Sequence, residues 1–345
     1  MVRPIVPFIQ HLTPKAQHLM AVRATNTLLL ALLVVLFATG IGGLLPPDSA
    51  WPVAFYGHRL AALGLLAMLV WKAPIVWRSW RRSGLGARGR WISLALLVWV
   101  AVTVALGLLW TLSGEPVPTP LGFSAVSLHS YVAALVVPFL LWHAAERWAA
   151  PKGRDFAGRR RALKLLATGS AAALTWAFLE AGLRRLSARR YTGSWEVGSF
   201  TGNRFPTTAF ITERPGPVDP ASWRLRIGGS VDDPLELTYA DLLTFEAEQV
   251  ATLDCTNGWY STQRWRGVWL ADILDRVGAQ GTFVQFKAVT GYQWLFTIEE
   301  ARTCLLATHV GDEPLSHGHG FPLRLVAADR RGFQWVKWLE SITIT

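Results

Sequence analysis

Four long apolar stretches dominate the first half of the chain. They cover residues 24–45, 53–77, 92–112 and 128–145. A helix of about 20 apolar residues is long enough to cross the hydrocarbon core of a bilayer, which is ~30 Å thick. Acidic residues are instead concentrated after Glu196, where the sequence is less apolar. The chain is therefore predicted to be multi-domain, with an all-α transmembrane helical bundle followed by a domain of a different kind.

Charges between the apolar stretches predict how the bundle is oriented. The loop at 78–91 carries five arginines and no acid, whereas the loops at 46–51 and 113–127 carry only Asp48 and Glu115. Loops rich in Lys and Arg stay on the cytoplasmic side, so the N-terminus and the residues after 146 are expected inside. This pattern accounts for much of the net charge of +11. Since no basic stripe is interleaved with aromatic residues, a nucleic-acid partner is not expected.

A fifth apolar segment, 165–179, is shorter and follows Arg160-Arg161. With the small residues at 169–173 it resembles an internal twin-arginine export signal, and the alternative is an ordinary basic cytoplasmic loop. Export would put everything after about residue 190 outside the bacterial cytoplasmic membrane, although four arginines between 184 and 190 would then lie on the unusual side. We expect three parts: a four-helix membrane domain (1–150), a fifth span with its signal (151–190) and a C-terminal domain (191–345).

Histidines in the apolar stretches are candidates for haem ligands. His129 and His143 are 14 residues apart, which is nearly four helical turns, or ~21 Å, on almost the same face. His58 begins the second stretch at the level of His129, and His18 precedes the first stretch at the level of His143. An ionisable group at such depth is a functional candidate by default, while the alternative is a set of interfacial histidines bonded to neighbouring helices.

This arrangement resembles the bacterial di-haem cytochrome b family, four-helix proteins that exchange electrons with quinols. The resemblance covers about residues 10–150. It implies two b-type haems, one held by His58 and His129 and one by His18 and His143, and a quinone or quinol partner. The candidates for contacts with the haem propionates are Arg59, Trp142 and Arg147.

From about Tyr191 onward, short strands and turns replace the long apolar stretches. Strands are predicted at 224–227, 283–286 and 341–344, and helices at 239–245, with Thr238 as a cap, and at 270–277. A domain of about 155 residues can bury a core of its own. The two cysteines, Cys255 and Cys304, are too few for a disulfide framework, although one bridge is possible.

Separated sequence blocks in this half resemble the sulfite oxidase-type molybdopterin oxidoreductases. In order, the blocks are 223–229, Leu-Asp-Cys-Thr-Asn-Gly-Trp at 253–259, 265–270, Gly-His-Gly-Phe-Pro-Leu-Arg-Leu at 318–325, and 332–339. The resemblance covers about residues 195–345. It implies an α+β fold that binds a molybdenum–molybdopterin cofactor and transfers oxygen atoms.

The resemblance also assigns roles to individual residues. Cys255 corresponds to the thiolate that ligates molybdenum, a metal suited to soft sulfur ligands; the alternative is an ordinary buried cysteine. Positive side chains suit the terminal phosphate of the pterin. The residues that fall where the family holds its cofactor are Asn203, Pro206, Thr207, Thr290, His319, Arg324, Trp335, Val336 and Lys337. Cys304 follows a predicted helix and is expected to fill the core.

The sequence departs from this family directly after the metal-ligand cysteine. Sulfite oxidases and plant-type nitrate reductases continue with Ala-Gly-Asn-Arg, whereas this chain has Thr-Asn-Gly-Trp at 256–259. Without the arginine, an anionic substrate is disfavoured, and the chain leans toward the bacterial methionine-sulfoxide reductase branch. In that branch the catalytic subunit works with a separate haem-bearing membrane partner. Tyr260 and Tyr292 are the further catalytic candidates, and Arg204 is a candidate to line the pocket.

Together these features predict a membrane-bound molybdenum enzyme. Electrons would pass between quinone, haems and molybdenum, and a sulfoxide- or N-oxide-like substrate would be reduced outside the cytoplasmic membrane. One alternative is a sulfite-oxidising enzyme in which electrons flow in the opposite direction, from molybdenum through the haems to quinone. Another is a haem electron carrier whose C-terminal domain only binds a partner. The sequence leaves the oligomeric state open.

Overall fold

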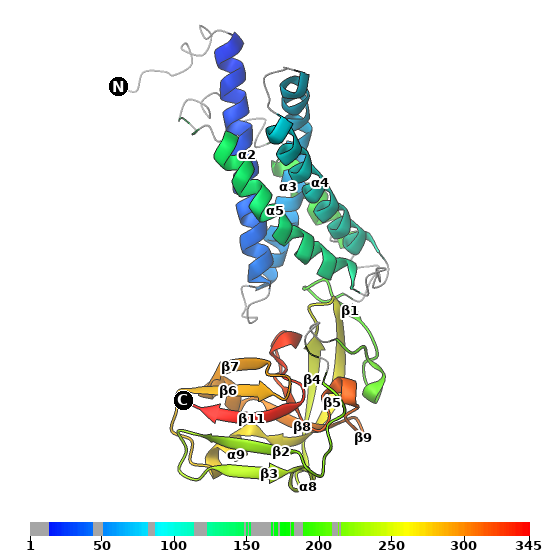
Figure 1. Cartoon of the computed structure of the whole chain (residues 1–345). Coiled ribbons are helices and arrows are strands. Elements are labelled where there is room, and N and C mark those ends of the chain that lie inside the picture. Colours follow the sequence, from blue (N-terminus) through cyan, green and yellow to red (C-terminus); the bar gives the residue numbers. More distant parts are fainter. Residues whose placement is uncertain are drawn as a thin grey trace, which may run out of the picture. The chain divides into compact units, whose positions relative to one another are not determined.

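The computed structural model describes residues 14–43, 51–81, 87–113, 123–147, 189–208 and 215–345, together with residue 213 and scattered positions between 150 and 182. The chain divides into two units, a first unit that ends at Thr192 and a second unit that runs over Gly193–Thr345. The first unit is helical and the second combines strands with short helices (Figure 1). This order, helices first and a mixed α/β part second, agrees with the sequence prediction.

Four long helices form the described part of the first unit. They are α2 (Pro14–Gly42), α3 (Trp51–Arg81), α4 (Ala87–Leu112) and α5 (Ala125–Arg147). Helix α2 packs against α3, and α4 packs against α5 (Figure 1). Each helix contains a stretch long and apolar enough to cross a membrane: Val22–Gly42, Val53–Val70, Trp91–Leu112 and Ala125–Glu146. These stretches lie within a few residues of the predicted ones, except that the second ends earlier.

Large apolar side chains on these helices point outward as well as inward. Val70 is 72% exposed, Leu141 is 65% exposed and Val34 is 58% exposed. A helix that is apolar on all sides fits a protein interior or a membrane better than water. Pro74 and Pro138 lie inside α3 and α5, a placement that membrane helices tolerate. The four helices could therefore span a membrane.

Some predictions concern residues outside the described part of the chain. The pair Arg160-Arg161 lies there, and of the fifth segment a short apolar helix is found at Gly169–Leu179. His18 and Arg147 belong to α2 and α5, but their side chains also lie outside the described part. The export signal and the haem-related roles of these two residues stay predictions.

Two sheets form the framework of the second unit. The larger sheet has the order β1-β5-β8-β10, with β4 also paired to β5 and β9 to β8. Its strands are β1 (Trp195–Glu196), β4 (Ala247–Asp254), β5 (Trp259–Trp269), β8 (Leu305–Val310), β9 (Glu313–Pro314) and β10 (Arg324–Val326). The smaller sheet has the order β3-β2-β11-β6-β7. Its strands are β2 (Arg224–Gly229), β3 (Leu235–Thr238), β6 (Phe283–Ala288), β7 (Gln293–Thr297) and β11 (Leu339–Ile344). Strand β11 runs parallel to β2 and antiparallel to β6, so the last strand joins two hairpins into one sheet (Figure 1).

Short helices and 3-10 turns connect the strands. They are α8 (Tyr239–Leu242), α9 (Leu270–Arg276), α10 (Ile298–Arg302), η1 (Gly202–Arg204), η2 (His317–His319) and η3 (Gly332–Gln334). Thr238 caps α8 in a reciprocal capping box with Asp241, which confirms the predicted cap. Helix α8 ends at Leu242 rather than at Phe245, because the N–H groups of Thr244 and Phe245 bond to carbonyls three residues back and tighten the chain into a 3-10 turn.

Strand β5 positions the core beneath the turn that carries Cys255. Its burial alternates along the strand, as expected for side chains that point to opposite faces. Trp265 is fully buried, and its ring centroid lies 5.6 Å from that of Trp335 and 5.9 Å from that of Phe205. Aromatic rings from three separate segments therefore pack together below the β4–β5 hairpin.

Gly267 permits the close approach of β5 and β8, and its replacement provides a test of this packing. A Cβ atom at this position would overlap the carbonyl oxygen of Leu306, so Gly267→Ala is expected to cost ~3 kcal/mol of stability. Gly228→Ala in β2 is the matched control, because nothing lies within 4 Å of a Cβ atom there. Urea unfolding of the purified full chain, followed by pulse proteolysis, measures both. Equal losses would contradict the packing described.

Candidate functional site

Cys255 lies in the turn that connects β4 to β5. Its N–H donates to the Trp259 carbonyl at 2.9 Å, and the Gly258 N–H donates to the Cys255 carbonyl at 3.0 Å. Gly258 has a φ of 89°, a left-handed conformation that favours glycine. The Asn257 N–H points at the Cys255 Sγ at 3.4 Å. The hairpin therefore holds an almost fully buried thiol, 8% exposed, at the edge of the core.

A buried ion pair fixes the residue next to this thiol. The Arg331 guanidinium lies 2.7 Å from the Asp254 carboxylate, and these side chains are 9% and 6% exposed. The Ser194 hydroxyl donates to the same carboxylate at 2.7 Å. Gly332 approaches so closely that a Cβ atom there would lie 3.1 Å from the Cys255 Cα. The ion pair thus clamps the loop after β10 onto the cysteine hairpin.

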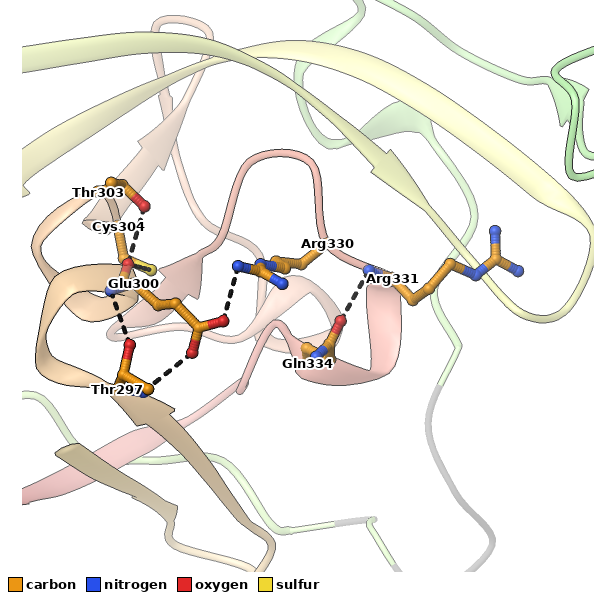
Figure 2. Close-up of polar contacts among 7 residues, drawn as sticks. All are labelled: Thr297, Glu300, Thr303, Cys304, Arg330, Arg331 and Gln334. Carbon is orange, nitrogen blue, oxygen red and sulfur yellow. Dashed lines mark hydrogen bonds and ion pairs between the residues drawn. The ribbon is translucent and has the colours of Figure 1, made fainter. Parts of the chain in front are cut away.

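Two consecutive arginines hold this loop from opposite sides. Figure 2 shows the guanidinium groups of Arg330 and Arg331 pointing away from each other. Arg330 pairs with Glu300 at 2.8 Å, and Glu300 also closes the capping box of α10 with Thr297. The Arg331 N–H donates to the Gln334 side chain at 3.0 Å. Helix α10 is therefore the anchor that allows Arg331 to reach toward Cys255.

Cys304 belongs to this anchor. It is 2% exposed, and its Sγ lies 3.5 Å from the Glu300 carbonyl oxygen (Figure 2). Burial raises the pKa of its thiol to about 12. Cys304 fills the core as predicted, and both cysteines are free.

Arg324 in β10 is a buried cation beside the thiol. Its exposure is 4%, and its NH1 donates to the His319 carbonyl at 3.0 Å. Its Cζ lies 5.4 Å from the ring centroid of Trp265 and 5.7 Å from that of Trp335, so the guanidinium contacts two aromatic faces. Burial lowers its pKa to about 10, while the nearby Cys255 opposes this shift.

Lys337 contributes a second cation. Its Nζ donates to the carbonyls of Thr208 at 2.9 Å and Gly318 at 3.2 Å, and lies 4.2 Å from the Trp338 ring centroid. Burial and, to a smaller extent, the charge of Arg324 lower its pKa to about 8. Because Cys255 also acts electrostatically on Lys337, both cations lie within range of the same thiol.

Burial favours the neutral form of the Cys255 thiol. Burial raises its pKa, and hydrogen bonds from the Asn257 N–H and the Thr208 side chain oppose the shift. The Trp259 indole donates to Thr208 Oγ1 at 3.2 Å and so orients that hydroxyl beside the sulfur. Since metals bind the thiolate, metal binding at Cys255 would release a proton.

His319 holds Arg324 through its own backbone carbonyl. Its Nε2 lies 3.0 Å from the Phe205 carbonyl and therefore donates, and its Nδ1 lies 2.7 Å from the Ser316 hydroxyl. Burial and the charge of Arg324 lower its pKa to about 4, so the ring is neutral at physiological pH. Both ring nitrogens bond to the protein, and the His319 carbonyl accepts from Arg324.

Asn203 likewise ties segments of the chain together. Its side-chain nitrogen donates to Glu313 at 3.1 Å and to the Pro314 carbonyl at 2.9 Å, and its oxygen accepts from the Ser316 N–H at 2.8 Å. These bonds join η1 to the segment after β9. Asn203 was predicted to contact the cofactor, and in the structure its amide positions the strip that follows it.

That strip leads directly to the thiol. Pro206 is half-buried and Thr207 is exposed. A Cβ atom at Gly318 would lie 2.9 Å from Thr207 Cγ2, which reflects close packing of the strip against η2. Thr208, which no sequence argument singled out, then bonds to Lys337 through its carbonyl and acts on Cys255 through its side chain.

Thr290 and Tyr292 lie on the Lys337 side of the site. The Thr290 hydroxyl donates to Glu213 at 3.1 Å, a residue whose charge also acts on Lys337. The Tyr292 hydroxyl donates to the Phe333 carbonyl at 2.6 Å. Burial, with the charge of Glu213, raises the Tyr292 pKa to about 12, so this phenol keeps its proton.

The remaining predicted residues differ in how closely they approach Cys255. Trp335 and Val336 are 2% and 1% exposed; the Trp335 indole donates to the Arg330 carbonyl at 3.3 Å, and the Val336 carbonyl accepts from Leu325 at 2.8 Å. Tyr260 follows Trp259 in β5 and so points to the opposite face of that strand. Arg204 is the last residue of η1 and is exposed.

Sequence reasoning missed Asp254, Arg331, Ser194 and Thr208. Asp254 directly precedes Cys255, and Arg331 directly precedes the closing block at 332–339, so position alone could have marked both as candidates. Ser194 and Thr208 carry no such signal, because isolated hydroxyl residues are common throughout the chain.

The charge balance of the site fits an anionic cofactor. Asp254 neutralises Arg331, whereas the hydrogen-bond acceptors of Arg324 and Lys337 within the described residues are backbone carbonyls. The Arg324 Nε is also buried without a hydrogen-bond partner among these residues. A buried cation is costly unless an anion compensates it. A soft metal carried on an anionic, phosphate-bearing ligand would use both cations and would take Cys255 as a thiolate.

Comparisons with known proteins show the family to which the second unit belongs. A sequence family described as "Oxidoreductase molybdopterin binding domain" matches residues 212–345. The uncharacterized oxidoreductase YuiH of Bacillus subtilis is 32% identical over 160 residues, which cover 44% of this chain and 81% of YuiH. The chain belongs to the molybdopterin-binding oxidoreductase family. Its second unit is a domain of the sulfite oxidase and MsrP type, as the sequence blocks predict.

Two further relatives have names that mention a substrate. The protein-methionine-sulfoxide reductase catalytic subunit MsrP of Gluconobacter oxydans is 28% identical over 231 residues, covering 55% of this chain and 70% of MsrP. The putative protein-methionine-sulfoxide reductase subunit YedZ1 of Azospira oryzae is 29% identical over 134 residues, covering 37% of this chain and 51% of YedZ1. This molybdopterin oxidoreductase thus spans most of YuiH and about half of YedZ1.

The first unit of this molybdopterin oxidoreductase brings two of the candidate histidines together. The ring centroids of His58 and His129 lie 6.1 Å apart. The His58 Nδ1 lies 3.1 Å from the Leu36 carbonyl and 3.0 Å from the Thr39 hydroxyl, and the His129 Nδ1 lies 2.8 Å from the Thr103 carbonyl. A carbonyl only accepts, so each Nδ1 donates and each Nε2 keeps its lone pair for a metal.

The other haem-related candidates make contacts of their own. The His143 Nδ1 lies 3.3 Å from the Ser93 hydroxyl. The Trp142 indole donates to Glu146 of its own helix at 2.9 Å. The Arg59 guanidinium lies over the Trp176 ring, 5.1 Å from its centroid.

Asp254→Asn tests the clamp beside Cys255. The variant leaves the Arg331 charge buried without its carboxylate, so a loss of ~3 kcal/mol in unfolding free energy is expected, together with weaker cofactor retention. Asp312→Asn is the control, because it removes the same charge from an exposed pair with Arg264 (Asp312 side chain 85% exposed) and should cost under ~1 kcal/mol. Denaturant unfolding of both full-length variants gives the comparison. A similar small loss in each would show that the clamp contributes little.

Proposed function

We propose that the chain is a membrane-bound molybdenum oxidoreductase that reduces a sulfoxide- or N-oxide-like substrate with electrons delivered through b-type haems from quinol. The observation that carries the proposal is the buried Cys255 thiol flanked by Arg324 and Lys337. The membership of the chain in the molybdopterin-binding oxidoreductase family supports the cofactor.

Each residue of the site has a role that follows from its surroundings. The cofactor, when bound, supplies oxygen-atom transfer at molybdenum. Cys255 is its protein ligand, and Arg324 and Lys337 bind its anionic groups. The Asp254–Arg331 pair and the Thr208 hydroxyl hold the sulfur in place. Asn203, Pro206, Thr207, Thr290, His319, Trp335 and Val336 shape the loops around the cofactor.

The substrate class follows from the absence of a cation in the cysteine turn. Trp259 stands where the resemblance expects an arginine, and it is buried against Phe205 with ring centroids 5.9 Å apart. A neutral, polar S=O or N–O group suits such a turn better than an inorganic anion does. The names of the relatives MsrP and YedZ1, both subunits of protein-methionine-sulfoxide reductases, support the same class. Tyr292, Tyr260 and Arg204 are the candidates for substrate contacts.

Haem binding is supported by the geometry of His58 and His129. Their ring centroids lie 6.1 Å apart, and each Nδ1 donates to a backbone carbonyl, so the two Nε2 atoms would be the groups that hold the haem iron. Gly107 and Gly40 let these rings lie against the neighbouring helices; a Cβ atom at Gly107 would lie 3.1 Å from His129 Nδ1. His143, with His18, is proposed to hold a second haem closer to the quinone.

The location of the catalytic unit outside the membrane is supported by contacts within the first unit. The Arg189 guanidinium donates to the carbonyls of Trp110 and Ser113, at the end of α4. By the loop charges this end is the outer one, whereas Arg147 ends α5 at the inner end. The chain would therefore cross the membrane once more between residues 147 and 189, and residues after 192 would lie outside.

Cys255→Ala tests the proposed role of Cys255 as the molybdenum ligand. Turnover of sulfoxides and N-oxides should be abolished, because the thiolate ligand is lost, while the haem absorption spectrum stays unchanged. Cys304→Ala is the control, since Cys304 fills the core behind α10, and it should keep turnover. Metal analysis and assays with sulfoxides, N-oxides, nitrate and sulfite measure the outcome. Full activity of Cys255→Ala would refute the mechanism, and preferential sulfite oxidation would favour the reverse reaction.

His129→Ala tests the haem limb. Removal of one axial ligand should lower the haem content from about two to about one per chain and leave the molybdenum content unchanged. His309→Ala, on β8 of the second unit, is the matched control and should keep both. Pyridine haemochrome spectra and elemental analysis of the purified chains report the two cofactors. A wild-type protein without a Soret band would refute the haem part of the proposal. The molybdenum part would be unaffected.

A further inference from the structure

The first unit contains a cavity of ≈ 470 Å³ that holds both haem-ligand candidates and three arginines. His58 and His129 line it together with Arg59, Arg189 and Arg190, and most of the other lining residues are apolar. Pockets for small molecules and cofactors usually measure ≈ 300–1,000 Å³. The cavity is therefore large enough for a cofactor and carries positive charge at one part of an otherwise apolar lining.

Contacts with the helices hold these arginines in the cavity wall. The Arg189 NH2 donates to the carbonyls of Trp110 at 3.0 Å and Ser113 at 2.5 Å, and the guanidinium lies 5.7 Å from the Trp110 ring centroid. The Arg190 guanidinium lies 5.9 Å from the Tyr191 ring centroid, and that ring packs against Phe55. Residues 189–191 are thus attached to α3 and α4.

Charge gives the cavity its chemical preference. Among the described residues that line it, three are arginines and none is Asp or Glu. Guanidinium groups in an apolar, membrane-embedded wall favour an anionic ligand, and Arg binds carboxylates with two parallel hydrogen bonds. Haem b carries two carboxylates on one edge of its ring, with the iron at the centre. The cavity offers histidine nitrogens and guanidinium groups in the combination that such a ligand needs.

We propose that Arg59, Arg189 and Arg190 bind the propionate carboxylates of the haem whose iron is ligated by His58 and His129. This inference rests on the proposed haem function. It accounts for a feature that the loop-charge rule leaves unexplained, namely arginines after the fifth apolar segment on the outer side of the membrane. In this arrangement the arginines are counter-ions of the haem carboxylates. The haem would thereby help to hold residues 189–191 in place.

A thermodynamic cycle between the arginines and the carboxylates tests the proposal. The full-length chain, depleted of haem in detergent, is titrated with haem and with haem dimethyl ester, which lacks the carboxylate charges. Wild type should bind haem about 10- to 100-fold more tightly than the ester, as expected for charged hydrogen bonds. In R189Q/R190Q the preference should fall to about twofold, because the coupling energy is lost. The midpoint potential of this haem should also fall, since a positive charge near iron favours the reduced state.

Controls separate the possible causes of a change. Arg226→Gln removes an exposed positive charge from β2 of the second unit (side chain 64% exposed) and should leave preference and potential unchanged. R189K/R190K keeps both charges and should retain most of the wild-type preference, which separates carboxylate binding from a general folding defect. An undiminished preference in R189Q/R190Q overturns the proposal and leaves the haem site intact. If R189Q/R190Q keeps its preference for haem over the ester but loses co-purified anionic phospholipid, the proposal is also overturned. The arginines would then bind a lipid headgroup. A wild-type chain that binds no haem overturns both this inference and the haem limb of the proposed function.

Discussion

The buried ion pair between Asp254 and Arg331 is the contact on which the geometry of the second unit depends. It joins the cysteine hairpin to the loop after β10, two segments that share no long strand pairing, and its side chains are almost fully buried. Because a buried charge without its partner is very costly, the loop and the hairpin keep one relative position. Arg330 and Glu300 complete the arrangement from the other side (Figure 2). The position of the Cys255 sulfur is thus set by charge pairing rather than by the sheet alone.

The same region holds two cations, Arg324 and Lys337, whose hydrogen-bond acceptors among the described residues are backbone carbonyls. Arg324 and Lys337 have lowered pKa values because burial disfavours their charged forms, and the Cys255 pKa is raised for the same reason. An anionic cofactor would compensate the charges of Arg324 and Lys337, and its metal would take Cys255 as the thiolate. Its binding free energy therefore adds to the stability of the folded chain. The charges and burial of these three residues therefore fit an anionic metal cofactor.

Much of the architecture could be read from local sequence patterns. The apolar stretches became helices, and Thr238 caps α8 because its capping box is local in sequence. Cys255, Arg324 and Lys337 were predicted as site residues from blocks of distinctive spacing, and in the structure both cations act electrostatically on the thiol. The pairing of Asp254 with Arg331 and the role of Thr208 depend on tertiary packing between distant segments, so no local pattern contains them. His319 and Asn203 show a further limit. The sequence predicted both residues near the site, but it did not predict their hydrogen-bond partners. These are Phe205 and Ser316 for His319, and Glu313 and Pro314 for Asn203.

The charge of Arg189 is compensated in part by carbonyl groups of the first unit itself. The last carbonyls of a helix lack intrahelical partners and carry partial negative charge. Arg189 donates to two such carbonyls at the end of α4, so the helix terminus and the guanidinium satisfy each other. This contact explains why residues 189–192 belong to the helical unit rather than to the strands that begin at Trp195. The same contact orders the guanidinium group before any ligand enters the cavity. The entropy cost of binding an anionic ligand there is therefore lower.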